Sequence, residues 1–153
     1  MPSNEEIALG AQVTGNVGLY YCCYRLSLRG WNVMPTARNA RGVDIVAYDQ
    51  DASRFVGVQV KALSKRSPVP LGKSLDKVMG DYWIIVNGVA TAAPKAFIML
   101  PSEVNERARK GEKDGRISYW LQPRDYEQEA FAEAWERIGF GSDLRKLADP
   151  EKD

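Results

Sequence analysis

Asp44, Gln59 and Lys61 are the residues of this sequence whose types and spacing best suit a catalytic site. Gln59 and Lys61 alternate with valines in a run that is typical of a β-strand, so both side chains are expected on one face. An antiparallel pairing of residues 43–48 with residues 55–61 across a turn would place Asp44 opposite Gln59, where side chains lie about 5 Å apart. A carboxylate, an amide and an ammonium group would then share one patch.

Such a patch suits phosphodiester hydrolysis. The carboxylate of Asp44 and the amide oxygen of Gln59 are ligands that Mg²⁺ accepts, because this ion prefers oxygen and keeps several waters. A bound ion polarises the phosphoryl group and lowers the pKa of a coordinated water. Lys61 would orient that water or neutralise the charge that develops on the phosphate oxygens.

The composition removes several other chemistries. The sequence has no histidine, which excludes Ser-His-Asp and Cys-His catalysis and histidine zinc sites. Its two cysteines, Cys22 and Cys23, are adjacent and have no third cysteine to bridge to, so a disulfide framework is not expected. Any catalysis must use carboxylates, lysine, tyrosine or a metal bound through oxygen.

The segments GVDIVAY at 42–48 and VGVQVK at 56–61 resemble two motifs of the PD-(D/E)XK nuclease superfamily. The resemblance covers roughly residues 14–100, and its lead-in includes Gly30-Trp31. It implies an α/β fold of the restriction-endonuclease-like class, a mixed β-sheet flanked by helices. It also implies a DNA nuclease in which Asp44 and Gln59 bind Mg²⁺ or Mn²⁺ and Lys61 is the catalytic lysine. Many members form dimers, so a homodimer is one assembly that it implies.

Two departures from the superfamily leave other functions open. Many members supply a glutamate from the first helix, whereas residues 14–29 contain no acid, so Asn16 or Tyr20 would have to face the site. Gln59 also replaces a charged ligand by a neutral one, which lowers the expected metal affinity. A catalytically inactive module that binds nucleic acid and a protein-interaction domain are therefore the alternatives.

The positioning elements follow from hydrophobic periodicity. Apolar residues at helical spacing predict a helix over residues 14–29, with Tyr20, Tyr21 and Tyr24 in the core. Strands are expected at 31–35, 43–48, 55–61, 82–86, 96–100 and 116–121, helices at 102–110 and 125–138, and a long loop at 64–80. Trp83, Trp120 and Trp135 are expected in the core.

Charge is unevenly distributed along the chain. Residues 1–80 hold 10 Lys and Arg against 6 Asp and Glu, a net charge of +4, while residues 81–153 hold 11 against 14, a net charge of −3. Basic residues in the loops around the motif are candidates for phosphate contacts. They are Arg38, Arg41, Lys65, Arg66, Lys73 and Lys77.

At 153 residues the chain is expected to form one nuclease-like domain over 1–140, followed by a charged tail at 141–153. No apolar run is long enough to span a bilayer, so no membrane association is expected. The polar start of the sequence lacks the features of a secretory signal, and a cytoplasmic location is the expectation.

Overall fold

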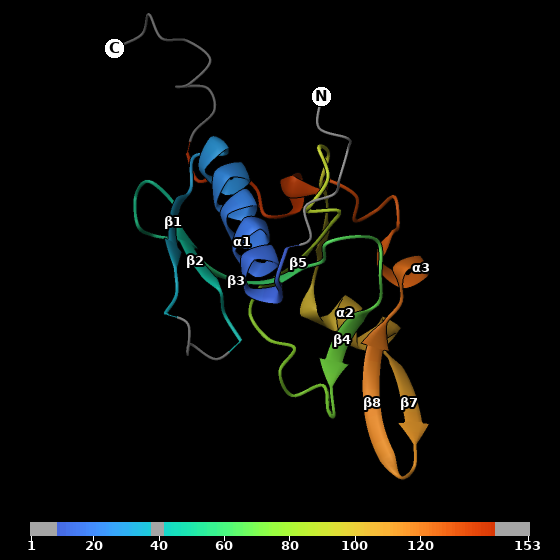
Figure 1. Ribbon diagram of the computed structural model, residues 1–153. Coiled ribbons are helices and arrows are strands. Elements are labelled where there is room, and N and C mark those ends of the chain that lie inside the picture. The colour runs from blue at the N-terminus through green and yellow to red at the C-terminus, as the bar shows by residue number, and fades with distance from the viewer. Residues whose placement is uncertain (1–8, 38–41, 143–153) are drawn as a thin grey trace, which may run out of the picture.

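The main sheet has five strands in the order β1-β2-β3-β5-β6. The structure, a computed structural model, describes residues 9–37 and 42–142. The strands are β1 (Asn32–Pro35), β2 (Ile45–Tyr48), β3 (Phe55–Ala62), β5 (Tyr82–Asn87) and β6 (Lys95–Met99). β3 runs parallel to β5, and the other neighbouring pairs are antiparallel. The mixed α/β sheet flanked by helices is therefore confirmed (Figure 1).

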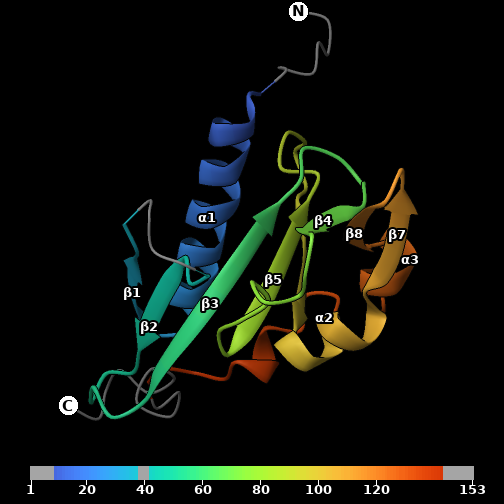
Figure 2. The ribbon, with the colours of Figure 1, turned by 90° about the horizontal axis from the view of Figure 1, so that it is seen from below.

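Helix α1 (Ala11–Leu28) covers one face of this sheet (Figure 2). Its buried residues are Thr14, Gly18, Cys22 and Leu26, which recur every four positions. Gly18 lies so close to β3 that an added Cβ would overlap the Cβ of Ala62. The glycine thus permits close helix–strand approach, which offsets its poor helix propensity.

A second, three-stranded sheet has the order β4-β8-β7. It consists of β4 (Val69–Gly72), β7 (Arg109–Lys113) and β8 (Arg116–Leu121). β7 and β8 form a hairpin that projects from the body of the molecule (Figure 1). The residues of β4 were predicted to lie in a loop, and that prediction was wrong. The helix predicted over 102–110 was wrong at its end, because residues 109 and 110 belong to β7. Helix α2 (Pro101–Arg107) ends earlier because Ala108 is extended.

The two faces of the main sheet form two hydrophobic cores. On the face of α1, β3 contributes Val56 and Val58, which pack with Cys22 and Leu26. On the other face, Trp83 and Ile85 of β5 pack with residues of β4, β6, α2 and the segment after β8. The continuously apolar strand β5 therefore contributes to both cores, as its sequence predicts.

The helix predicted over 125–138 is absent. Only α3 (Pro123–Tyr126) and a 3-10 turn, η1 (Trp135–Arg137), form there. The segment between them bonds to β6 instead: the amide of Ile98 donates to Phe131 O, and the amide of Glu133 donates to Ala96 O, with Glu133 at a positive φ of 49°. Trp135 is nevertheless buried, as expected, and so are three other apolar residues of this segment: Tyr126, Phe131 and Ile138.

The predicted tail at 141–153 lies mostly outside the described residues. Its first residue, Gly141, is buried, donates to Arg29 O and accepts from the amide of Gln50. None of the described helices is long and apolar enough to cross a bilayer.

Candidate active site

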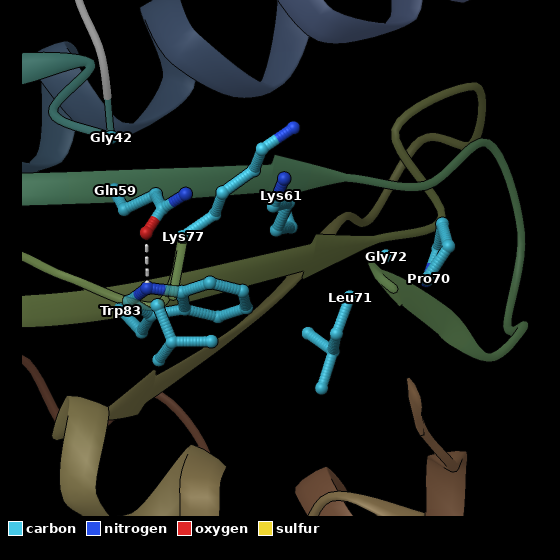
Figure 3. A pocket seen from close by; sticks show the side chains of 9 residues that line it. Gly42, Gln59, Lys61, Pro70, Leu71, Gly72, Lys77 and Trp83 are labelled. Carbon is cyan, nitrogen blue, oxygen red and sulfur yellow. Dashed lines mark hydrogen bonds between the residues drawn. The ribbon is translucent and has the colours of Figure 1, made fainter. Parts of the chain in front are cut away.

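A cavity of about 340 Å³ opens beside the second half of β3. Gln59 and Lys61 line it from β3, Trp83 from β5, Pro70 from β4 and Lys77 from the loop between β4 and β5 (Figure 3). The remaining lining residues are Gly42, Leu71, Gly72 and Val78. The lining thus includes two lysines and no acidic residue, which makes the cavity attractive to an anion.

Gln59 is buried, with 6% of its surface exposed, and its orientation is set by two donors. Its Oε1 accepts hydrogen bonds from the indole Nε1 of Trp83 and, at 3.3 Å, from the amide of Met79. Because both partners can only donate, the oxygen must face them. The NH₂ group is the part of the Gln59 amide left for other partners.

Lys61 is half-buried and follows Gln59 on the same face of β3. Its Nζ lies 5.6 Å from the centroid of the Trp83 ring, within the range of a cation–π contact. Lys77 is exposed and reaches the same cavity from a loop. Neither lysine has an acidic partner within ion-pair distance among residues 9–37 and 42–142.

Asp44 lies in a bend just before β2. The predicted hairpin register is confirmed from Tyr48 opposite Phe55 to Ile45 opposite Val58. It does not continue to Asp44 opposite Gln59, because the amide of Asp44 donates to Val58 O. The backbone is thus displaced by one residue at this point, as in a β-bulge.

The carboxylate of Asp44 is fixed by the backbone of β3. Its Oδ2 accepts a hydrogen bond of 2.7 Å from the amide of Val60, the residue between Gln59 and Lys61. Burial raises the pKa of the Cys22 thiol on α1, and Cys23 and the Asp44 charge add smaller contributions. The carboxylate of Asp44 is therefore bonded to the backbone between Gln59 and Lys61, although Asp44 does not line the cavity with them.

The residues present could hold a hard metal if waters or a substrate completed the coordination of Asp44. In the described part of the chain, no three residues of the types Asp, Glu, Cys and His gather into a potential metal cluster. Asp44 offers a carboxylate, whereas the Gln59 oxygen would have to release Trp83 or Met79 to become a ligand. Mg²⁺ is commonly held by one or two carboxylates, waters and substrate phosphates, and a site with Asp44 fits that pattern.

No family model and no curated protein sequence matches the chain. A solved structure, the bacterial homing endonuclease I-Ssp6803I, superposes with a TM-score of 0.59 over 94% of this chain and 100% of that one, at 16% sequence identity. The chain has the fold of a homing endonuclease.

Within this endonuclease-like fold, the predicted phosphate-contacting residues differ in their surroundings. Lys65 and Lys73 are exposed, whereas Arg66 forms an ion pair with Glu127 at 2.6 Å. Arg38 and Arg41 lie outside the described residues. Lys77 is the loop residue that reaches the cavity of Gln59 and Lys61.

The first helix of this endonuclease-like fold does not bring its tyrosines to the core or to the cavity. Tyr20 and Tyr24 are 63% and 61% exposed, so the expected core packing is wrong for both, while Tyr21 is partly buried against Trp135. Asn16 is also exposed. α1 packs against Val60 and Ala62, which alternate with Gln59 and Lys61 along β3. Neither Asn16 nor Tyr20 lines the cavity.

The contacts of Trp83 with Gln59 and Lys61 were not predicted from the sequence. Trp83 was expected only in the core, yet it both orients Gln59 and lies below Lys61. The signal that could have found it is the parallel register, in which Gln59 is the direct partner of Trp83.

Proposed function

We propose that the chain is a metal-dependent DNA nuclease of the PD-(D/E)XK type. The observation that carries the proposal is the cavity in which Gln59 and Lys61 lie together with Lys77 and without an acidic residue. Two ammonium groups and a buried amide suit a phosphodiester, which is anionic and accepts hydrogen bonds. The shared fold with a homing endonuclease supports DNA as the nucleic acid.

The proposed roles follow from the position of each group. Asp44, held by the Val60 amide, would hold Mg²⁺ or Mn²⁺, which would supply polarisation of the phosphoryl group and a water of lowered pKa. Lys61, over Trp83, neutralises the charge on the phosphate oxygens while water forms a new P–O bond and the bond to the leaving sugar oxygen breaks, that oxygen taking up a proton from solvent. Lys77 binds the neighbouring phosphate, and the NH₂ group of Gln59 donates to the phosphate held by Lys61.

A cleavage assay tests this function. Purified protein is incubated with supercoiled, linear and single-stranded DNA in Mg²⁺, Mn²⁺ or EDTA, and the products are resolved on gels. We expect metal-dependent cleavage that falls about 100-fold or more in Lys61→Ala, the usual scale for removing one group that stabilises the transition state. Lys95→Ala, an exposed lysine outside the cavity, should cleave like the wild type. Equal cleavage by Lys61→Ala, or none by the wild type, contradicts the proposal.

A second candidate function is a DNA-binding module without catalysis. The observations that favour it are the engagement of the Gln59 oxygen by two donors and the absence of any acidic residue from α1. Cleavage and metal-free DNA binding, both measured for the wild type and Asp44→Asn, separate the two candidates. If the protein is a binding module, the Asp44→Asn variant should bind DNA as tightly as the wild type, and neither protein should cleave it. If the protein is a nuclease, the wild type should cleave DNA and Asp44→Asn should not.

A further inference from the structure

The hairpin of β7 and β8 is a rigid basic ribbon that the site does not use. Its turn is Asp114-Gly115, and both residues have positive φ, 53° and 77°. This is the tight two-residue turn whose twist matches that of the strands. The five cross-strand pairs run from Arg109 opposite Trp120 to Lys113 opposite Arg116. The ribbon therefore keeps its shape where it projects from the body.

One face of this ribbon is basic and exposed. Residues opposite one another share a face, so Lys113, Arg116, Ser118 and Trp120 lie together on it. Lys113 and Arg116 are exposed and have no ion pair in the described part of the chain. Arg109, on the same face, is instead bound through two nitrogens to Asp125, at 2.7 and 2.8 Å. The unpaired positive charges of this face are thus at the tip, where they outnumber the one negative charge of the turn residue Asp114 by two to one.

The basic face continues into the candidate active site. Pro70 of β4 is the direct partner of Trp120 on β8 and also lines the cavity of Lys61. The row Pro70, Trp120 and Arg109 crosses all three strands of the second sheet. A ligand that fills the cavity can therefore extend over Trp120 toward the tip without leaving this face.

We propose that this outer face of the second sheet, Lys113, Arg116, Ser118 and Trp120, is a docking surface for double-stranded DNA that enters a groove of the duplex. The proposal rests on the nuclease function proposed above and adds to it the surface that holds the substrate. A two-stranded ribbon fits the major groove of B-DNA, which is about 12 Å wide. Lys113 and Arg116 bind phosphates on the groove walls, and Trp120 packs against the sugar-phosphate edge nearer the cavity.

Duplex DNA fits this surface better than a single strand. Proteins that bind single strands stack successive bases on several aromatic side chains. The described face offers a single well-exposed aromatic ring, Trp120, whose indole donates to Ser118 Oγ at 3.0 Å. Two cations at the tip of a narrow ribbon match the charge of groove walls instead.

Trp120 provides a probe of this contact. It is 37% exposed, whereas Trp31, Trp83 and Trp135 are at most 3% exposed. Acrylamide should therefore quench mainly the fluorescence of Trp120, and Trp120→Phe should abolish most of that quenching. In EDTA, so that no cleavage occurs, saturating duplex DNA should reduce acrylamide quenching of the wild type to nearly the level of Trp120→Phe. Unchanged quenching at saturation overturns the proposal.

Charge-matched variants complete the test. Binding of a labelled duplex is measured by anisotropy in EDTA for Arg116→Glu and for Lys95→Glu, which change net charge equally; Lys95 lies on β6, outside the ribbon and the cavity. We expect Arg116→Glu to bind about tenfold more weakly than Lys95→Glu, with a salt dependence reduced by about one phosphate contact. Circular dichroism confirms that both variants fold.

Besides unchanged quenching, two results overturn the docking surface: equal affinities of the two variants, or tighter binding of a single strand than of the duplex by the wild type. The nuclease function is decided separately by the Lys61→Ala cleavage assay. A protein that cleaves DNA through Lys61 but binds equally well as Arg116→Glu and Lys95→Glu would retain the function and lose only this surface.

Discussion

The indole nitrogen of Trp83 donates a hydrogen bond to the side-chain amide oxygen of Gln59. The two residues are direct partners on the parallel strands β3 and β5. The amide of Met79, which precedes β5, donates to the same oxygen. A residue of the candidate site is therefore held by the neighbouring strand and by the loop before it. The conformation of Gln59 depends on the sheet itself and not on a bound ligand.

Gln59→Leu should destabilise the protein by about 1–3 kcal/mol, because the buried N–H groups of Trp83 and Met79 lose their acceptor. Urea unfolding followed by circular dichroism measures this change. Gln50→Leu is the matched control: Gln50 is exposed and makes one side-chain bond, to Gly30 O. We expect a loss below about 1 kcal/mol there. Equal losses in the two variants would show that the acceptor at Gln59 does not matter.

Gln59→Glu should strengthen metal binding. The carboxylate keeps an oxygen for the two donors and, in place of the NH₂ group, offers a second oxygen with negative charge one residue before Val60, whose amide bonds to Asp44. Since metal affinity rises with the number of charged ligands, the Mn²⁺ concentration for half-maximal cleavage should fall by about tenfold. Isothermal titration with Mn²⁺ in the absence of DNA gives an independent readout. An unchanged Mn²⁺ requirement in both measurements would place the metal away from residue 59.

Gly18→Ala and Gly15→Ala should change stability in opposite directions. A Cβ at Gly18 would overlap Ala62, so α1 must shift, at a cost of about 1–3 kcal/mol. Gly15 is exposed in the same helix with nothing within 4 Å of an added Cβ, and alanine there should stabilise by about 0.5–1 kcal/mol. Thermal unfolding of the two variants tests this contrast. A Gly18→Ala protein as stable as Gly15→Ala would mean that α1 is not seated closely on β3.

The ion pair between Arg109 and Asp125 should make stability fall at acid pH. The hydrogen bonds from Arg109 lower the pKa of Asp125 below its ordinary value of 3.8. A carboxyl with a lowered folded pKa stabilises the protein above its unfolded pKa, and this stability is lost as pH falls through the folded value. Asp125→Asn should therefore be less stable than the wild type at pH 7, and the difference should shrink below about pH 4.

Urea midpoints measured from pH 7 to pH 2.5 follow this difference. Arg109→Gln, which removes the other partner, should reproduce the smaller acid dependence of Asp125→Asn. If wild type and Asp125→Asn lose stability in parallel over the whole range, the ion pair does not contribute.

The sequence predicts the β2–β3 hairpin well because alternation and turn chemistry are local. Four residue pairs have the expected register, and Asp49, at the start of the turn, accepts hydrogen bonds from the amides of Ser53 and Arg54. The extension to Asp44 fails because a bulge depends on how the preceding segment meets β3. Alternation cannot reveal such a displacement.

The buried face of α1 could not be read from periodicity. Apolar residues occur around the whole helix. The face that packs on the sheet is the one on which Gly18 lets the helix backbone come close to β3, so the larger side chains of Tyr20 and Tyr24 remain exposed on another face. The expected burial of Trp120 was wrong for a related reason. The core side of β8 is defined by its pairing with β4, which the sequence reads as loop.

The missing C-terminal helix reflects competition between local and distant hydrogen bonds. Residues 127–134 have an apolar spacing that suits a helix, but Phe131 and Glu133 bond to the exposed edge of β6. The carboxylate of Glu133 adds a bond to the amide of Ala96. Single-sequence patterns do not report such tertiary partners.

The bond between Asp44 and the Val60 amide has a consequence for the handling of the protein. β2 ends its pairing with β3 at Val58. Among the described residues no strand pairs with this edge of β3 beyond that point, and Asp44 binds the first amide there. An uncovered strand edge is a template on which other chains can add. Asp44→Ala would leave that template open and favour self-association and precipitation, whereas Asp44→Asn keeps an acceptor at the edge. Loss of activity in an alanine variant therefore has to be measured on material shown to be monodisperse.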